Sequence, residues 1–316
     1  MSLFALQPMT LAGRPELGFA AATGTFSILY AGGRRTVERA RVLPFVAAGL
    51  SLCAALGALA GAGGTWAVAV GTVAIALLGA STAYAWSLGP PGPLFFVLVF
   101  GLTAYVTSTT PMAPLEFVLA VVAGCVFSFA IAMTPLVLPR VRAASARPLR
   151  ELLPGPRLDG PARLLLARAA IVAVAGVGIG LVLDPARGYW IVGAGLAVVG
   201  VAADRRAAFS RGLHRMAGTL VGAGAYSLLA LLHPAGLWLA VLLGVLQFAI
   251  ELVVVRNYAL ALVFITPLVL LLTGAATGDL GSASAALERI VDTFAGALLG
   301  AVTGVLHPRA GRSASA

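Results

Sequence analysis

Long apolar stretches alternate with short clusters of Arg, Pro and Gly along this chain. They predict helices at roughly 17–32, 42–61, 65–87, 93–109, 115–138, 164–183, 188–203, 213–233, 236–255, 258–275 and 287–306. A bilayer core of about 30 Å needs about 20 helical residues, so most of these segments are long enough to cross it, and 17–32 and 188–203 are short. The pattern predicts an all-α polytopic membrane protein with about 11 transmembrane helices.

The order of these segments repeats once. A shift of 172 residues superposes Arg34 on Arg206 and Trp66 on Trp238. Because the shift of six segments preserves direction, the sequence predicts two parallel repeats. The N-terminal repeat is expected to lack its first helix, which would fall at or before residue 11 and is either missing or reduced to Leu3–Leu11.

An Arg- and Pro-rich stretch separates the two predicted repeats. The expected domains are a transmembrane repeat at 1–138, a cytoplasmic linker at 139–163, a transmembrane repeat at 164–307 and a cytoplasmic tail at 308–316.

Composition supports the membrane class. The 316 residues are 60% hydrophobic and 10% charged, whereas soluble domains carry about 25% charged residues, and the mean hydropathy is +1.01. All 21 basic residues are arginine, and the net charge is +10. Seventeen arginines fall on one side of the predicted topology and three on the other, which places the N-terminus outside and the C-terminus in the cytoplasm. No basic run is interleaved with stacking aromatics, so the lipid bilayer, not nucleic acid, is the expected partner.

One helical face in the second half carries polar groups that do not suit lipid. Arg211, Arg215, Thr219, Gly222 and Tyr226 recur at helical spacing. The form R-x-x-[G/D]-T-x-x-G that begins at Arg215 recurs in the last segment, where it begins at Arg289 and includes Asp292. The glycines of both motifs are interpreted as helix-packing positions.

Two of the acids inside predicted spans are candidate site residues. Glu251 is expected to face the bundle interior, either as a proton-coupling site or as an ion-pair partner of Arg215 or Arg256. Asp292 carries the same alternatives, with Arg289 as its partner.

Further residues could line a path through the bundle. Asn257 and Tyr258 lie at the predicted cytoplasmic mouth, and Thr266 precedes a mid-span proline that either exposes polar backbone to a cavity or only kinks the helix. Trp190 lies beside a short span and either lines a pocket or belongs to the interfacial aromatic belt. The three histidines are scattered, and no Ser-His-Asp set or nucleotide motif is present, so neither an enzyme nor a metal or cofactor site is expected.

Residues 188–306 resemble a known family. In order, a short span that begins Y-W, the motif R-G-L-H-R-M-A-G-T-L-V-G, the motif R-N-Y-A-L-A-L-V-F-I-T-P-L and the motif R-I-V-D-T-F-A-G look like the fusaric acid resistance protein (FUSC) family, which includes aromatic acid exporters. Plant aluminium-activated malate transporters are more distantly similar. The resemblance implies a bacterial inner-membrane exporter of organic, often aromatic, carboxylic acids that is driven by the proton gradient.

The sequence therefore predicts efflux of an organic anion from a bacterial cytoplasm. The residues expected to line the substrate path are Arg211, Arg215, Thr219, Tyr226, Asn257, Tyr258, Thr266 and Trp190, and those expected to couple protons or form ion pairs are Glu251, Asp292 and Arg289. A passive organic-anion channel and a non-transporting membrane scaffold are the alternatives. Association into a homo-oligomer is left open.

Overall fold

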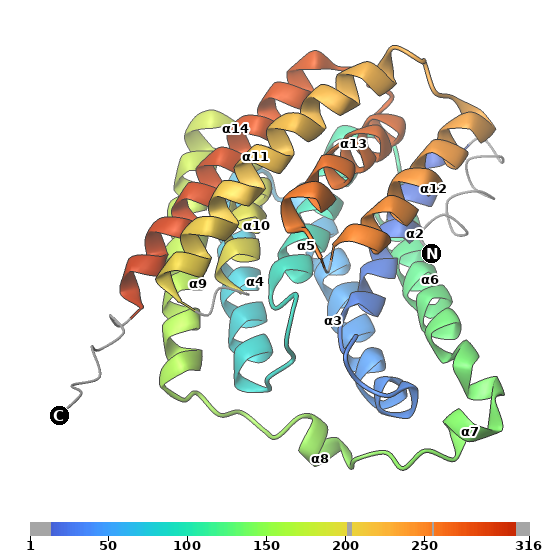
Figure 1. The fold of residues 1–316 in the computed structure, drawn as a ribbon. Coiled ribbons are helices and arrows are strands. Elements are labelled where there is room, and N and C mark those ends of the chain that lie inside the picture. The colour runs from blue at the N-terminus through green and yellow to red at the C-terminus, as the bar shows by residue number, and fades with distance from the viewer. Residues whose placement is uncertain (1–13, 201–203, 255, 308–316) are drawn as a thin grey trace.

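All regular secondary structure in the computed structural model is helical over the residues that it describes, which are 14–200, 204–254 and 256–307 (Figure 1). The all-α prediction is confirmed for these residues. The main helices of the first half are α2 (Pro15–Gly24), α3 (Thr36–Ala62), α4 (Thr65–Ala85), α5 (Leu94–Thr109) and α6 (Pro114–Met133). Those of the second half are α9 (Gly160–Leu183), α10 (Gly188–Val199), α11 (Arg205–Ala230), α12 (Gly236–Val253), α13 (Tyr258–Thr277) and α14 (Ala283–Val302). The predicted remnant Leu3–Leu11 and the tail 308–316 lie outside the described residues.

Fewer helices than predicted meet the requirements of a membrane span. Over the described residues, seven helices are long and apolar enough to cross a membrane, namely α3, α4, α6, α9, α12, α13 and α14. Helices α5 and α10 are apolar but have only 16 and 12 residues, and 12 residues rise about 18 Å. Helix α11 has 26 residues, but its apolar part begins only after Arg215. The count of eleven transmembrane helices is not confirmed, although each predicted segment overlaps one helix.

Several helices begin earlier than the apolar pattern suggests. Helix α3 begins at Thr36 and not at residue 42, and α11 begins at Arg205 and not at residue 213. The side chain of Asp204 caps α11 by accepting a hydrogen bond of 2.8 Å from the backbone N–H of Ala207. Arginines expected in loops therefore lie on the polar ends of helices.

Glycines bring α10 and α14 into backbone contact. A Cβ on Gly296 would lie 2.1 Å from the carbonyl oxygen of Ile191, and a Cβ on Gly300 would lie 2.6 Å from that of Gly195. Because successive glycines meet successive turns, the two helices run parallel. The interpretation of the α14 glycines as packing positions is confirmed.

Helix pairs in the two halves pack in the same order. In the first half α2 packs on α6, and α3 packs on α5 and α6; in the second half α10 packs on α14, and α11 packs on α13 and α14. The halves meet where α5 contacts α10, where α2 contacts α13 and where α4 contacts α9. Helix α10 is buried from Tyr189 to Val199, so a short helix lies in the middle of the bundle.

The segment between the halves is tied to the first half. It contains the short helices α7 (Pro139–Arg142) and α8 (Leu149–Leu152) and runs across one end of the bundle (Figure 1). Arg147 donates hydrogen bonds of 2.8 and 3.2 Å to the buried carboxylate of Glu38, and this bonding raises the pKa of Arg147. Arg41 donates to the carbonyl oxygen of Arg147 at 2.6 Å. These contacts hold the linker against α3.

Replacing Gly296 by alanine tests the α10–α14 contact. The added Cβ meets backbone, so we expect the helices to separate and the protein to lose on the order of 1–3 kcal/mol of stability. The measurement is thermal unfolding of the purified protein in detergent. Gly178→Ala is the matched control, because its Cβ meets nothing within 4 Å; equal stability of the two variants would contradict the packing role.

Candidate anion-binding site

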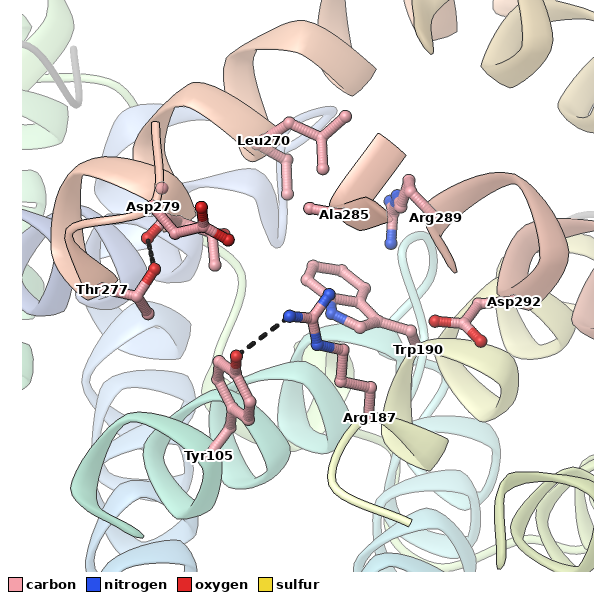
Figure 2. A pocket seen from close by; sticks show the side chains of 12 residues that line it. Tyr105, Arg187, Trp190, Leu270, Thr277, Asp279, Ala285, Arg289 and Asp292 are labelled. Carbon is pink, nitrogen blue, oxygen red and sulfur yellow. Dashed lines mark hydrogen bonds between the residues drawn. The ribbon is translucent and has the colours of Figure 1, made fainter. Parts of the chain in front are cut away.

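A small cavity lies where the two halves meet, between α5, α10, α13 and α14 (Figure 2). We call it the Arg289 cavity. Its lining residues are Tyr105, Arg187, Trp190, Val269, Leu270, Thr273, Gly274, Thr277, Asp279, Ala285, Arg289 and Asp292. It therefore combines residues of α5 from the first half with residues of the second.

Arg289 is the principal cation of this cavity. Its side chain comes from α14 and is only 6% exposed. The guanidinium carbon lies 4.0 Å from the centre of the Trp190 ring, a distance typical of a cation–π contact. The Nε and Nη1 atoms are buried and have no hydrogen-bond partner among the described residues. Because unmade hydrogen bonds of a buried charge are costly, this arginine is suited to accept an anion.

Asp292 lies one helical turn after Arg289 and also lines the cavity (Figure 2). It is 4% exposed and makes no hydrogen bond or ion pair within the described part of the chain. Its carboxylate is still close enough to interact electrostatically with Arg289 and Arg187. The aspartate thus balances charge without occupying the free N–H groups of Arg289. The ion pair with Arg289, one of the two alternatives expected from sequence, is not formed among the described residues, and proton coupling stays a prediction.

Arg187 closes one side of the cavity. It forms an ion pair with Glu288 at the start of α14 and donates a hydrogen bond of 3.0 Å to the hydroxyl of Tyr105 on α5. Asp184 lies 3.7 Å from its Nε. These contacts join the first half of the chain to α10 and α14 at the end where α10 and α14 begin.

The enclosed space is about 30 Å³, which has room for one or two water molecules. An aromatic carboxylate does not fit into this volume. In this conformation the cavity therefore has room only for water-sized groups.

A second group of cations lies on α11. Arg215 is 7% exposed and donates a hydrogen bond of 2.7 Å to the hydroxyl of Tyr258, while its Nε is buried without a partner among the described residues. The guanidinium of Arg211 lies 3.8 Å from the centre of the Tyr258 ring. Arg215 is also close enough to Arg289 for their charges to repel. The structure thus brings Arg211, Arg215 and Tyr258 together and places them near the Arg289 cavity.

The other expected path residues differ in what they contact. Thr219 and Thr266 are buried, and the hydroxyl of Thr266 has no partner among the described residues. The Tyr226 hydroxyl accepts a hydrogen bond of 3.0 Å from the backbone of Gly281, and the exposed Asn257 caps α13 through Leu260. Tyr226 and Asn257 therefore have structural partners. Helix α13 continues through Pro267, the residue after Thr266. The helix is therefore not broken at this proline.

Glu251 does not face the bundle interior, contrary to the expectation from its sequence. Its side chain is exposed and accepts a hydrogen bond of 3.1 Å from Gln247. It forms no ion pair with Arg215 or Arg256 among the described residues. The reason is the position of α12, which packs chiefly on α13 and leaves its other faces uncovered.

Two residues that close one side of the cavity, Tyr105 and Arg187, are not among the candidates expected from sequence. Tyr105 was not considered because it lies 82 residues before its partner Arg187, and no local pattern links them. Arg187 precedes Tyr189 by two residues and Trp190 by three, and this position is a usable sequence signal. Among the described residues, no group of His, Cys, Asp and Glu could hold a metal ion.

Most residues of the Arg289 cavity lie in a segment that matches a known protein family. Residues 168–303 match the family model described as "Fusaric acid resistance protein-like". The Bacillus subtilis (strain 168) "Uncharacterized membrane protein YvaC" is 30% identical over 142 residues, which cover 44% of this chain and 22% of that protein. No solved structure matches the chain. The expected resemblance is confirmed for residues 168–303, which include every residue of the Arg289 cavity except Tyr105.

The contacts of Tyr258 predict a graded loss of stability. Tyr258→Phe removes the acceptor of Arg215 and is expected to cost about 1–3 kcal/mol, because a buried charged donor is left unpaired. Tyr258→Leu also removes the ring beneath Arg211 and is expected to cost about 0.5–1 kcal/mol more.

Thermal unfolding of the purified variants provides the measurement. Tyr189→Phe is the matched control, because the Tyr189 hydroxyl is buried without a partner among the described residues and its removal should not destabilise the protein. If Tyr258→Phe were as stable as this control, the hydrogen bond to Arg215 would not contribute to the stability of the protein.

Proposed function

We propose that the chain is a membrane transporter that exports organic, chiefly aromatic, carboxylate anions from a bacterial cytoplasm. The coarser conclusion rests on the apolar helices and on the family match. The observation that supports the finer proposal is the buried guanidinium of Arg289, which lies over Trp190 with two nitrogens unpartnered among the described residues.

The chemistry of Arg289 favours a carboxylate. A guanidinium presents its N–H groups in a planar fork that matches the two oxygens of a carboxylate, and such charge-assisted hydrogen bonds are among the stronger ones in proteins. Trp190 lies against one face of the guanidinium and is an aromatic residue of the same cavity. A planar aromatic acid satisfies both features.

The packing supports two parallel repeats that move against each other. Equivalent helix pairs pack in each half, and the α5–α10 contact joins the halves beside the Arg289 cavity. In this proposal, separation of α5 from α10 and α14 breaks the contacts of Arg187 and opens the closed cavity. Carriers of this kind expose one site alternately to the two sides of the membrane.

The arginine distribution supports an orientation in the inner membrane with the N-terminus outside and the C-terminus in the cytoplasm. Arg211 and Arg215 then lie on the cytoplasmic side of Arg289. They attract anions from the cytoplasm by their positive potential and pass them to Arg289. The water-sized cavity favours a carrier with closed states over a passive channel.

We further propose that Asp292 couples transport to protons. Without substrate, its carboxylate balances Arg289. A substrate carboxylate on Arg289 would place two negative charges side by side, and a proton on Asp292 removes that repulsion. The proton and the anion then cross together, so export runs down the outward gradient of the substrate. The other groups that act on Asp292 are Arg187, Asp184, Glu288 and Tyr189; of these, Arg187 is already paired with Glu288.

Replacing Arg289 tests the central proposal. Arg289→Gln removes the charge-assisted hydrogen bonds, so we expect efflux of benzoate from preloaded cells to fall at least about tenfold. Arg215→Ala should also abolish efflux. The measurement is loss of labelled benzoate at matched protein levels in a strain that lacks its own exporters.

Arg142→Gln is the control, because Arg142 is exposed on α7 in the linker. Normal efflux by Arg289→Gln at normal protein level would refute the carboxylate role. A scaffold that transports nothing would show no efflux even in the unmodified protein.

Replacing Asp292 tests proton coupling separately. In proteoliposomes under an imposed pH gradient, the unmodified protein should accumulate benzoate on the alkaline side faster than protein-free liposomes do, because the anion and the proton move together down the proton gradient. Asp292→Asn mimics the protonated state, so we expect exchange of benzoate to remain and accumulation to disappear. Accumulation by this variant would exclude Asp292 as the coupling group, and benzoate conductance indifferent to the pH gradient in the unmodified protein would favour a channel.

A further inference from the structure

A second cavity lies outside the transport site, on the surface formed by α11 and α14. It is an open groove of about 590 Å³ between the first half of α11 and the last turns of α14 with the following 3₁₀ turn. This volume lies within the range of sites that hold small organic ligands. In Figure 1 the two helices lie side by side along one edge of the bundle. We call this surface the α11–α14 groove.

The walls of the groove are apolar. Phe209 and Leu213 of α11 and Val302 of α14 line it and are 58%, 46% and 58% exposed. Val305 of the 3₁₀ turn is 54% exposed. In a membrane-spanning protein such a surface is in contact with acyl chains, which are as apolar as these side chains.

One end of the groove is basic. Arg205, Arg206 and His214 line it and are exposed. None of the three makes a hydrogen bond or ion pair within the described part of the chain. Asp204, the nearest acid in sequence, is exposed and already caps α11 through Ala207. The groove therefore combines apolar walls with two guanidinium groups that have no ion-pair partner among the described residues.

This combination matches one class of ligand. A phospholipid has acyl chains for the apolar walls and a phosphate for the arginines, and basic pockets between membrane helices recognise anionic headgroups. A zwitterionic headgroup brings a cation of its own, which the arginines repel. We propose that the α11–α14 groove is a specific binding site for one anionic phospholipid of the phosphatidylglycerol type.

The site is independent of the proposed transport chemistry. It uses exposed residues on the α11–α14 pair, whereas Arg215 and Arg289 on the same helices are buried. Binding can therefore be measured without a transport assay.

Native mass spectrometry of the full-length protein in detergent tests the proposal. The probes are phosphatidylglycerol and phosphatidylcholine with identical acyl chains. We expect one phosphatidylglycerol to be retained at least about tenfold more strongly than phosphatidylcholine. Arg205→Gln together with Arg206→Gln should remove this preference, because each arginine near a headgroup contributes to anionic lipid binding.

A control variant and a variant of the apolar wall complete the experiment. The double variant Arg140→Gln and Arg142→Gln removes the same charge from the exposed linker and should leave the preference intact. Leu213→Trp fills the groove and should weaken retention of both lipids. Equal retention of the two lipids, an unchanged preference in the Arg205 and Arg206 variant, or a lipid-free dimer that covers this face would each overturn the proposal.

Discussion

The arrangement of the bundle interior depends on the contact between the Arg289 guanidinium and the Trp190 ring. This contact requires α10 and α14 to approach until their backbones touch, which Gly296 and Gly300 permit. A charge buried among apolar helices is costly unless it is compensated. The ring and the nearby carboxylate of Asp292 compensate it in part, and two N–H groups of the arginine remain without a partner among the described residues.

Buried arginines in this chain are stabilised mostly by groups other than carboxylates. Arg211 and Arg215 share the ring and hydroxyl of Tyr258. Arg168, which is fully buried on α9, donates to the Thr303 hydroxyl and the Gly300 carbonyl at the end of α14 and contacts the His307 ring. Aromatic rings and backbone carbonyls hold a guanidinium without neutralising it. These guanidinium groups therefore keep their positive charge inside the bundle, which supports the proposed anion path.

Helices α11 and α14 face two different environments. Their buried sides carry the arginines, threonines and glycines of the interior, and their exposed sides carry large apolar residues such as Phe209 and Leu298. The arginines at the start of α11 lie at the boundary between apolar and polar surroundings. Interior polarity and exterior lipid contact are thus built into the same two helices by their helical periodicity.

The sequence by itself determined the membrane class, the order of the helices and the polar face of α11. These features follow from local composition and helical spacing, which a single segment encodes. Only the tertiary structure decided that Arg187 and Tyr105 close the cavity, that Asp292 stays unpaired within the described chain beside Arg289, and that Glu251 points outward from α12. The physical reason is that spacing identifies a polar face, whereas the group that this face meets depends on contacts between distant helices.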